Sequence, residues 1–129
     1  METSKKQLVF PTQGAKPIGP YSPAIRIGDL LFTSGQIGLD PQTGKLVPGG
    51  VEAEARQALT NIKTLVEAGG SSLNRVVKTT LFLTDIANFA AVNQIYAEFF
   101  SSEPPARSTV QVAALPAGAL FEIDAIAAL

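Results

Sequence analysis

The segment at residues 51–68 constrains the fold more than any other part of the chain. Gly69 and Gly70 follow it directly, and glycine readily adopts the left-handed conformation that ends a helix. The segment therefore predicts an α-helix with one buried side, which other elements must cover. Its apolar residues recur with the helical period: Val51, Ala55, Ala58, Leu59, Ile62, Leu65 and Val66.

Three strand-like segments precede this helix, at residues 7–10, 24–27 and 30–37. A loop rich in glycine and proline, residues 11–23, separates the first from the second. Gly28 and Asp29 fit a two-residue hairpin turn between the second and the third. Residues 40–44 carry a second turn signal, with Asp first, Pro next and Gly near the end, and residues 45–47 are expected to return as a short strand.

The second half of the chain predicts a strand, a helix and two further strands. Residues 76–83 are β-branched and aromatic, as in a largely buried strand. Asp85 is placed to cap a helix at about residues 86–100. Strands follow at residues 108–113 and 120–129, and the last is apolar enough to predict packing on both faces. The buried face of the second helix is expected to carry Phe89, Val92, Tyr96 and Phe99 or Phe100.

This order of elements predicts an α+β fold in a single domain, residues 1–129, with a mixed sheet and both helices on one face. The chain offers no third helix to cover the other face. Charged residues make up 16% of the sequence, against about 25% in typical soluble domains. Both observations favour self-association, and the alternative is a weakly charged monomer.

Composition excludes several kinds of site. The chain has no Cys and no His, which rules out disulfides, a Ser-His-Asp triad and a zinc site of the usual type. With 10 basic and 11 acidic residues and no basic stripe, the sequence does not support nucleic-acid binding. No apolar run approaches the roughly 20 residues that span a bilayer. The N-terminal residues lack the apolar stretch of a signal peptide, so a cytoplasmic location is expected.

Arg107 and Glu122 are the strongest candidates for a functional pair. Pro104 and Pro105 stiffen the approach to Arg107, because each fixes φ and restricts the residue before it. A planar guanidinium can hold a carboxylate through two parallel hydrogen bonds. Glu122 adds a proton-transfer group, so the pair predicts a site for a small acid. The alternatives are a surface ion pair for Arg107 and a solvent-facing Glu122 that shares a strand face with Asp124.

A set of short motifs extends this prediction over most of the chain. In this order, from about residue 7 to 129, the set resembles the RidA/YjgF family of reactive-intermediate deaminases. The motifs are Gly19-Pro20-Tyr21-Ser22, Phe32-Thr33-Ser34-Gly35-Gln36, Val92-Asn93 with Tyr96, Pro105-Ala106-Arg107-Ser108 and Phe121-Glu122-Ile123.

The resemblance implies a chorismate-mutase-like fold and a homotrimer whose sites lie in clefts between adjacent subunits. It implies hydrolysis of 2-imino acids, such as 2-iminopropanoate and 2-iminobutanoate formed from enamines like 2-aminoacrylate. The products are 2-oxo acids and ammonia, and no cofactor or metal is used.

The resemblance also assigns roles to the two strongest candidates. Arg107 corresponds to the family's carboxylate-binding arginine, and Glu122 to its catalytic glutamate, which would position or deprotonate the attacking water and later help to protonate the departing nitrogen. Tyr21 would line the pocket with its hydroxyl near the reacting nitrogen or water, and the alternative is a packed loop aromatic.

The remaining candidates are substrate-binding residues. Ser34 and the adjacent backbone of Gly35 would contribute to the site, as would Asn93. The alternatives are that Ser34 is an ordinary strand serine beside a glycine in a bulge, and that Asn93 is an exposed helix asparagine. Thr109 departs from the family, because many bacterial members carry Cys there; its backbone carbonyl would still orient the water.

Two other functional classes stay open on the sequence. The same cleft could bind a 2-oxo or amino acid without catalysis and regulate a partner. A holdase-like or translation-inhibiting activity is a further alternative, although the lack of a basic patch argues against a role with RNA.

Overall fold

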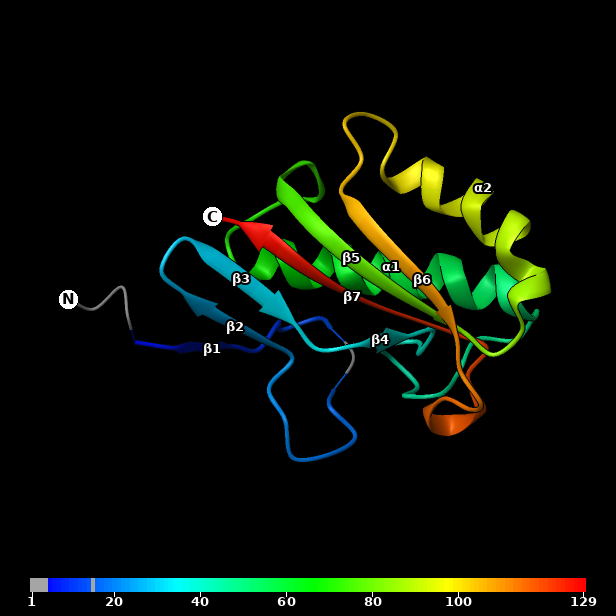
Figure 1. The fold of residues 1–129 in the computed structure, drawn as a ribbon. Helices are drawn as coiled ribbons and strands as arrows, with labels where there is room; N and C mark the ends of the chain where they lie inside the picture. The colour runs from blue at the N-terminus through cyan, green and yellow to red at the C-terminus, as the bar shows by residue number, and fades with distance from the viewer. Residues whose placement is uncertain (1–4, 15) are drawn as a thin grey trace.

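The computed structural model describes residues 5–14 and 16–129. In these residues seven strands form one mixed sheet in the order β1-β2-β3-β7-β5-β6, with β4 paired to β7 (Figure 1). Only the β5–β6 pair is parallel. The strands are β1 (Gln7–Val9), β2 (Ala24–Ile27), β3 (Leu30–Thr33), β4 (Gln36–Ile37), β5 (Val76–Leu83), β6 (Ala106–Gln111) and β7 (Phe121–Ala128). The helices are α1 (Val51–Ala68) and α2 (Phe89–Phe99), with short 3-10 turns η2 (Leu73–Arg75), η3 (Ile86–Asn88) and η4 (Pro116–Gly118).

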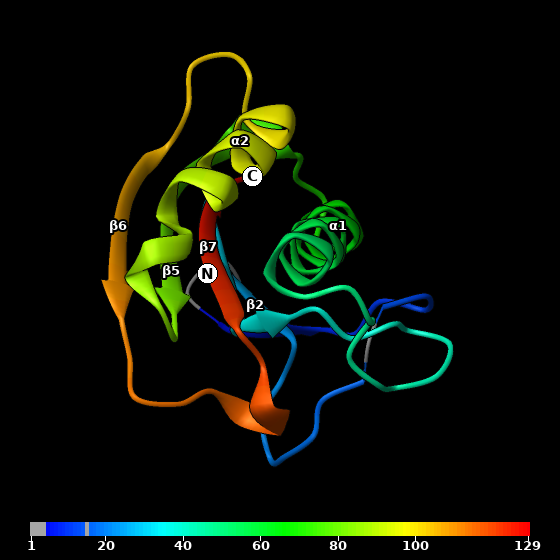
Figure 2. The same cartoon turned by 90° about the vertical axis from the view of Figure 1, so that its right-hand side faces the viewer.

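Both helices lie on the same side of the sheet, as Figure 2 shows, and share one apolar core with it. The prediction of a mixed sheet with two helices on one face is confirmed. Along β7, Phe121, Ile123, Ala125 and Ala127 are buried, while the residues between them are only partly buried. The prediction that this strand is packed on both faces is therefore wrong for the single chain, because no element among the described residues covers its second face.

Helix α1 begins and ends where the apolar period predicts. Gly70 has φ of 90°, and its N–H donates to the Glu67 carbonyl, while Ser71 N–H donates to the Val66 carbonyl. These two bonds satisfy carbonyls that the last turn of a helix leaves unpaired. Gly69 keeps an ordinary right-handed φ of −81°, so of the two glycines only Gly70 adopts a backbone conformation that favours glycine.

The second helix differs in detail from its prediction. Asp85 caps the chain as expected, accepting from Ala87 N–H at 2.9 Å, but the first turn is η3 and the α-helix begins only at Phe89. Val92, Tyr96 and Phe100 are buried as predicted. Ile95 is buried too, whereas Phe89 is 37% exposed because it lies at the outer end of the helix, under the side chain of Arg107.

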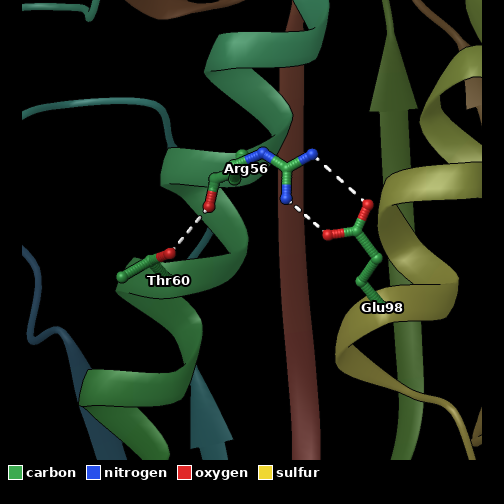
Figure 3. A network of polar contacts seen from close by, with 3 residues as sticks. All are labelled: Arg56, Thr60 and Glu98. Atoms are coloured by element: carbon green, nitrogen blue, oxygen red, sulfur yellow. Dashed lines mark hydrogen bonds and ion pairs between the residues drawn. The ribbon is translucent and has the colours of Figure 1, made fainter.

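An exposed ion pair joins the two helices. Arg56 on α1 donates to the Glu98 carboxylate on α2 at 2.5 and 3.3 Å, and Thr60 donates to the Arg56 carbonyl at 2.8 Å (Figure 3). The pairing lowers the pKa of Glu98, chiefly through the hydrogen bond from Arg56. Because both side chains are about half exposed, the pair contributes little to stability.

The predicted strand at 30–37 is interrupted. Phe32 pairs with Ile126 and Gln36 with Ile123, so the three residues 33–35 lie opposite the two residues 124–125. This is a β-bulge, and the Thr33 hydroxyl replaces a backbone partner by accepting from Ala125 N–H at 2.9 Å. The bulge turns residues 34–35 toward the carboxyl group of Glu122.

Two other strand predictions need correction. Residues 45–47 form only a single bridge, Leu39 with Leu46, because the 40–44 turn is followed at once by the loop that leads to α1. Strand β6 starts at residue 106 rather than 108 and ends at 111 rather than 113, because its pairing with β5 begins opposite Lys78. Arg107 therefore lies within the sheet.

The face of the sheet away from the helices carries large apolar side chains. Those that are exposed include Leu8, Ile27, Leu30, Phe32 and Val110. Leu8 is 55% exposed, and strand register puts the other four on the same face as Leu8.

In the described residues no helix is long and apolar enough to cross a membrane.

Candidate functional site

A cavity of about 300 Å³ opens where β4 and the start of β7 meet the loop before β2. We call it the Glu122 pocket. It brings together Tyr21, Ser34, Gly35 and Glu122, all of which the sequence predicts as site residues. Its remaining walls are Lys16, Pro17, Ile18, Pro23, Gln36, Ile37, Leu39 and Pro116.

Gly35 leaves room for the carboxyl group of Glu122. A Cβ at this position would lie 2.8 Å from Glu122 Cδ, closer than real side chains approach. The β-bulge brings the backbone into this contact, so the carboxyl group of Glu122 lies directly against the Gly35 backbone.

Ser34 fixes the loop that carries Tyr21. Its N–H donates to the Pro23 carbonyl at 2.8 Å, and its hydroxyl donates to the Ser22 carbonyl at 2.6 Å. The Tyr21 hydroxyl accepts from Ile18 N–H at 3.3 Å, while its ring is 43% exposed at the pocket wall. The hydroxyl of Tyr21 thus keeps its own hydrogen to donate to a bound molecule.

Burial raises the pKa of Glu122, and the nearby Asp124 carboxylate adds to the effect. A carboxyl group with a raised pKa can hold a proton closer to neutral pH and return it during a reaction. The electrostatics of the pocket therefore suit acid–base chemistry at Glu122.

Polar residues of α1 support the inner wall of the pocket. This role was not among the predictions from the sequence. Asn61 donates to the carbonyls of Ile37 and Leu39 at 3.2 and 2.9 Å, and Gln57 donates to Asn61 Oδ1 at 2.9 Å. Glu54 accepts from Leu120 N–H at 2.8 Å. The sequence did contain a signal for this role: Glu54 and Asn61, seven residues apart, are polar residues within the apolar stripe of α1.

A second group of predicted residues lies between β6 and α2. We call Phe89, Asn93, Tyr96, Arg107 and Thr109 the Arg107 cluster. The guanidinium carbon of Arg107 lies 4.8 Å from the centre of the Tyr96 ring and 5.5 Å from that of Phe89. Stacking on two rings holds the guanidinium and leaves its N–H groups free at the edge. Arg107 forms no ion pair with any residue of the described chain.

The aromatic support of Arg107 is itself fixed. The Tyr96 hydroxyl shares a 2.7 Å hydrogen bond with Thr79 in the core. Burial raises the pKa of Tyr96, although the Thr79 bond and the Arg107 charge oppose the rise. The hydroxyl therefore stays neutral and serves as a structural anchor for the ring.

Asn93 and Thr109 bring unused polar atoms to the Arg107 cluster. Asn93 Oδ1 and Thr109 Oγ1 are buried without a hydrogen-bond partner among the described residues. Unpartnered buried polar atoms are uncommon in folded proteins and often mark a ligand site. Their position beside a free guanidinium is consistent with a small polar ligand at this end of β6.

Arg107 and Glu122 lie on opposite faces of the sheet. Thr79 on β5 pairs with both Arg107 and Ala125, and directly paired residues share a face. Ala125 is buried under the helices, and Glu122 precedes it by three residues, which reverses the face. One chain therefore does not bring the two groups to the same small molecule.

Within the described residues no group of three or more His, Cys, Asp or Glu side chains could hold a metal ion. That the reaction uses no cofactor stays a prediction.

Comparison with known proteins places the chain in a well-populated group. The family described as Endoribonuclease L-PSP matches residues 12–129. A RutC family protein of Pyrococcus horikoshii is 49% identical over 95% of this chain and 97% of its own. The 2-iminobutanoate/2-iminopropanoate deaminase of Mus musculus is 46% identical over 98% of this chain and 94% of its own. The crystal structure of E. coli TdcF with bound serine has a TM-score of 0.91 and 40% identity, over 95% of this chain and 98% of that one.

Proposed function

Because the chain belongs to the Endoribonuclease L-PSP family, the RidA/YjgF family that its motifs resemble, we propose that it hydrolyses reactive 2-imino acids to 2-oxo acids and ammonia. The substrates are of the 2-iminopropanoate and 2-iminobutanoate type. Two observations carry the proposal: a ring-stacked guanidinium at Arg107 with no ion-pair partner in the described residues, and a pocket carboxyl group at Glu122 whose pKa is raised by burial. A relative of 46% identity is named a deaminase of such compounds.

The site is composed of two chains. The Arg107 cluster of one subunit faces the Glu122 pocket of the next, since one chain holds them on opposite faces of its sheet. A contact between two different surfaces of identical chains is heterologous, and it forms a ring when the rotation between neighbours closes. The resemblance gives that ring three members, and the exposed apolar side chains on the bare sheet face supply surface for it.

The chemistry needs orientation and proton transfer more than a strong nucleophile. An imine carbon next to a carboxylate is already electrophilic. Arg107 holds the carboxylate through paired hydrogen bonds, with Asn93 and Thr109 beside it. Glu122 and Tyr21 position a water over the carbon, and Glu122 moves the protons. A positioned acid or base contributes about 10²- to 10⁴-fold, and positioning of the reactants adds to this.

The family description names an endoribonuclease, but this chain gives little support to RNA cleavage. Its net charge is −1 and it has no basic stripe, whereas binding of a phosphate backbone draws on clustered Lys and Arg. A small carboxylate fits better, and serine, an amino acid, is the molecule bound to TdcF. A cytoplasmic location belongs to the proposal, because enamines are released by enzymes of amino-acid metabolism.

A coupled assay tests the proposal. A PLP-dependent dehydratase releases 2-aminoacrylate from serine, and pyruvate formation is followed with the wild-type protein and with Arg107→Ala. We expect the wild type to accelerate pyruvate formation and the variant to lose the acceleration. If neither protein changes the rate while a 2-oxo acid still binds the wild type, the chain is a binding protein rather than an enzyme.

A further inference from the structure

A row of polar side chains crosses the otherwise apolar face of the sheet. Glu122 and Asp124 lie on β7, two residues apart, and therefore on the same face. Asp124 pairs with Thr80 on β5, and Thr80 pairs with Ser108 on β6. Lys78, also on this face, donates to the Ser108 hydroxyl at 2.9 Å.

If another subunit covers this face, burying these polar side chains costs free energy, because polar and charged groups lose hydration there. The apolar neighbours of the row by register are Ile126 beside Lys78, and Phe82 beside Glu122. The amine of Lys78 bonds to Ser108 and makes no contact ion pair with Asp124. Asp124 therefore has no contact ion pair within the described residues, and its carboxylate can act on Glu122.

We propose that Asp124 is a positioning residue for Glu122: the Asp124 carboxylate, two residues away on the same face of β7, favours the protonated form of the Glu122 carboxyl group, which gives its proton to the departing nitrogen. The inference rests on the proposed deaminase function. In that step Glu122 gives its proton to the amino group of the tetrahedral adduct. The C–N bond breaks and ammonia leaves with the bonding electron pair. The Glu122 carboxylate then takes the proton of the adduct hydroxyl as the carbonyl forms.

The surroundings divide the roles between the two acids. Burial raises the pKa of both, but Lys78 and a hydrogen bond from Thr80 oppose the rise at Asp124, and no such group opposes it at Glu122. These surroundings favour ionisation of Asp124 over ionisation of Glu122. The other titratable groups facing Glu122 are Lys16 and Tyr21 in the pocket wall.

The strands packed against Glu122 add no charge of their own. Its direct partners on β5 and β4 are Phe82 and Ile37. Asp124 is thus the nearest acidic neighbour on the sheet, and it is the group to change.

The test is a ¹³C NMR titration of the Glu122 and Asp124 carboxyl carbons in the assembled protein. Asp124→Asn should move the Glu122 midpoint to lower pH. Asp29→Asn, which removes an exposed charge outside the row, should leave it in place. In the wild type alone, Asp124 should titrate at lower pH than Glu122, so the experiment does not depend on the folding of a variant.

Activity profiles complete the test. With Asp124→Asn, the pH at which kcat falls on the alkaline side should move down together with the Glu122 midpoint, and Asp124→Glu should restore it. An unchanged Glu122 midpoint in Asp124→Asn, or a wild-type Glu122 that titrates before Asp124, overturns the inference whether or not the chain is a deaminase. A moved midpoint with an unmoved kcat profile overturns the proton-delivery role. Lack of activity in the wild type would instead refute the proposed function, while the titration still decides the coupling.

Discussion

The backbone of Gly35 lies against the carboxyl group of Glu122, so close that a Cβ at position 35 would come within 2.8 Å of Glu122 Cδ. The contact exists because the bulge at residues 33–35 turns the strand toward β7. Glycine at this position is thus part of the construction of the pocket, even though it has no side chain to offer.

Gly35→Ala should remove most of the deaminase activity and leave the fold intact. The added methyl group displaces the Glu122 carboxyl, and misplacement of a reacting group by about 1 Å can cost about 100-fold. The measurement is kcat together with a thermal melt. The matched control is Gly19→Ala, whose Cβ would lie 3.5 Å from the Tyr21 ring in ordinary contact. Equal activity in the two variants would show that Glu122 tolerates displacement.

Arg107→Lys should not rescue the function that Arg107→Ala loses. Lysine keeps the charge but loses the planar fork and the stacking on Phe89 and Tyr96. Loss of one hydrogen bond to a charged group costs about 1.5–3 kcal/mol, or roughly 10- to 150-fold in kcat/KM. Arg56→Lys, in the exposed ion pair between the helices, is the control and should retain activity. A fully active Arg107→Lys would mean that only a positive charge is needed.

Glu122→Gln should stabilise the protein at pH 7 but not at pH 4. Below the ordinary pKa of 4.5 the carboxyl group is protonated in both the folded and the unfolded chain. As the pH rises through the raised pKa of the folded state, the wild type must ionise a half-buried group, and its free energy of unfolding falls. The glutamine variant avoids that loss.

Denaturant unfolding of both proteins at one concentration and two pH values measures this difference. Glu67→Gln, at an exposed glutamate on α1, is the control. A stability difference between wild type and Glu122→Gln that is the same at both pH values would contradict the raised pKa of Glu122.

The sequence predicts the main elements well because their signals are local. The apolar period of α1 and the glycines after it set both of its ends, and β5 is predicted with the bounds it has. The start of α2 after Asp85 is not set by the cap alone, because an N-cap marks the first turn without deciding whether that turn is a 3-10 turn or part of the α-helix.

The bulge and the division of the site could not be predicted in the same way. The shift at residues 33–35 depends on pairing with β7, some 90 residues later, and on the hydroxyl of Thr33 taking the place of a backbone acceptor. The opposite orientations of Arg107 and Glu122 follow from the register of β5 between them. Neither is visible in local patterns, although each predicted residue lies in one of the two groups.

Asn61→Leu should weaken both the fold and the pocket. The substitution leaves the Ile37 and Leu39 carbonyls without their side-chain donor. A buried group left unsatisfied costs about 1–3 kcal/mol, so the midpoint of unfolding should fall, and kcat/KM should fall with the loosened wall. Gln94→Leu, an equivalent change on the exposed side of α2, should alter neither. An Asn61→Leu variant as stable and active as the wild type would show that Asn61 does not support the pocket.

We propose that Arg107 of one chain and Glu122 of another complete each site, and subunit mixing tests this arrangement most directly. Arg107→Ala and Glu122→Gln are each inactive in the pyruvate assay by this account. If equal amounts are unfolded together and reassembled, about one quarter of the sites should receive an intact arginine from one chain and an intact glutamate from its neighbour. Activity should therefore return to about a quarter of the wild-type value. Mixed oligomers that form, as mass spectrometry would verify, but remain inactive would show that both groups must come from the same chain.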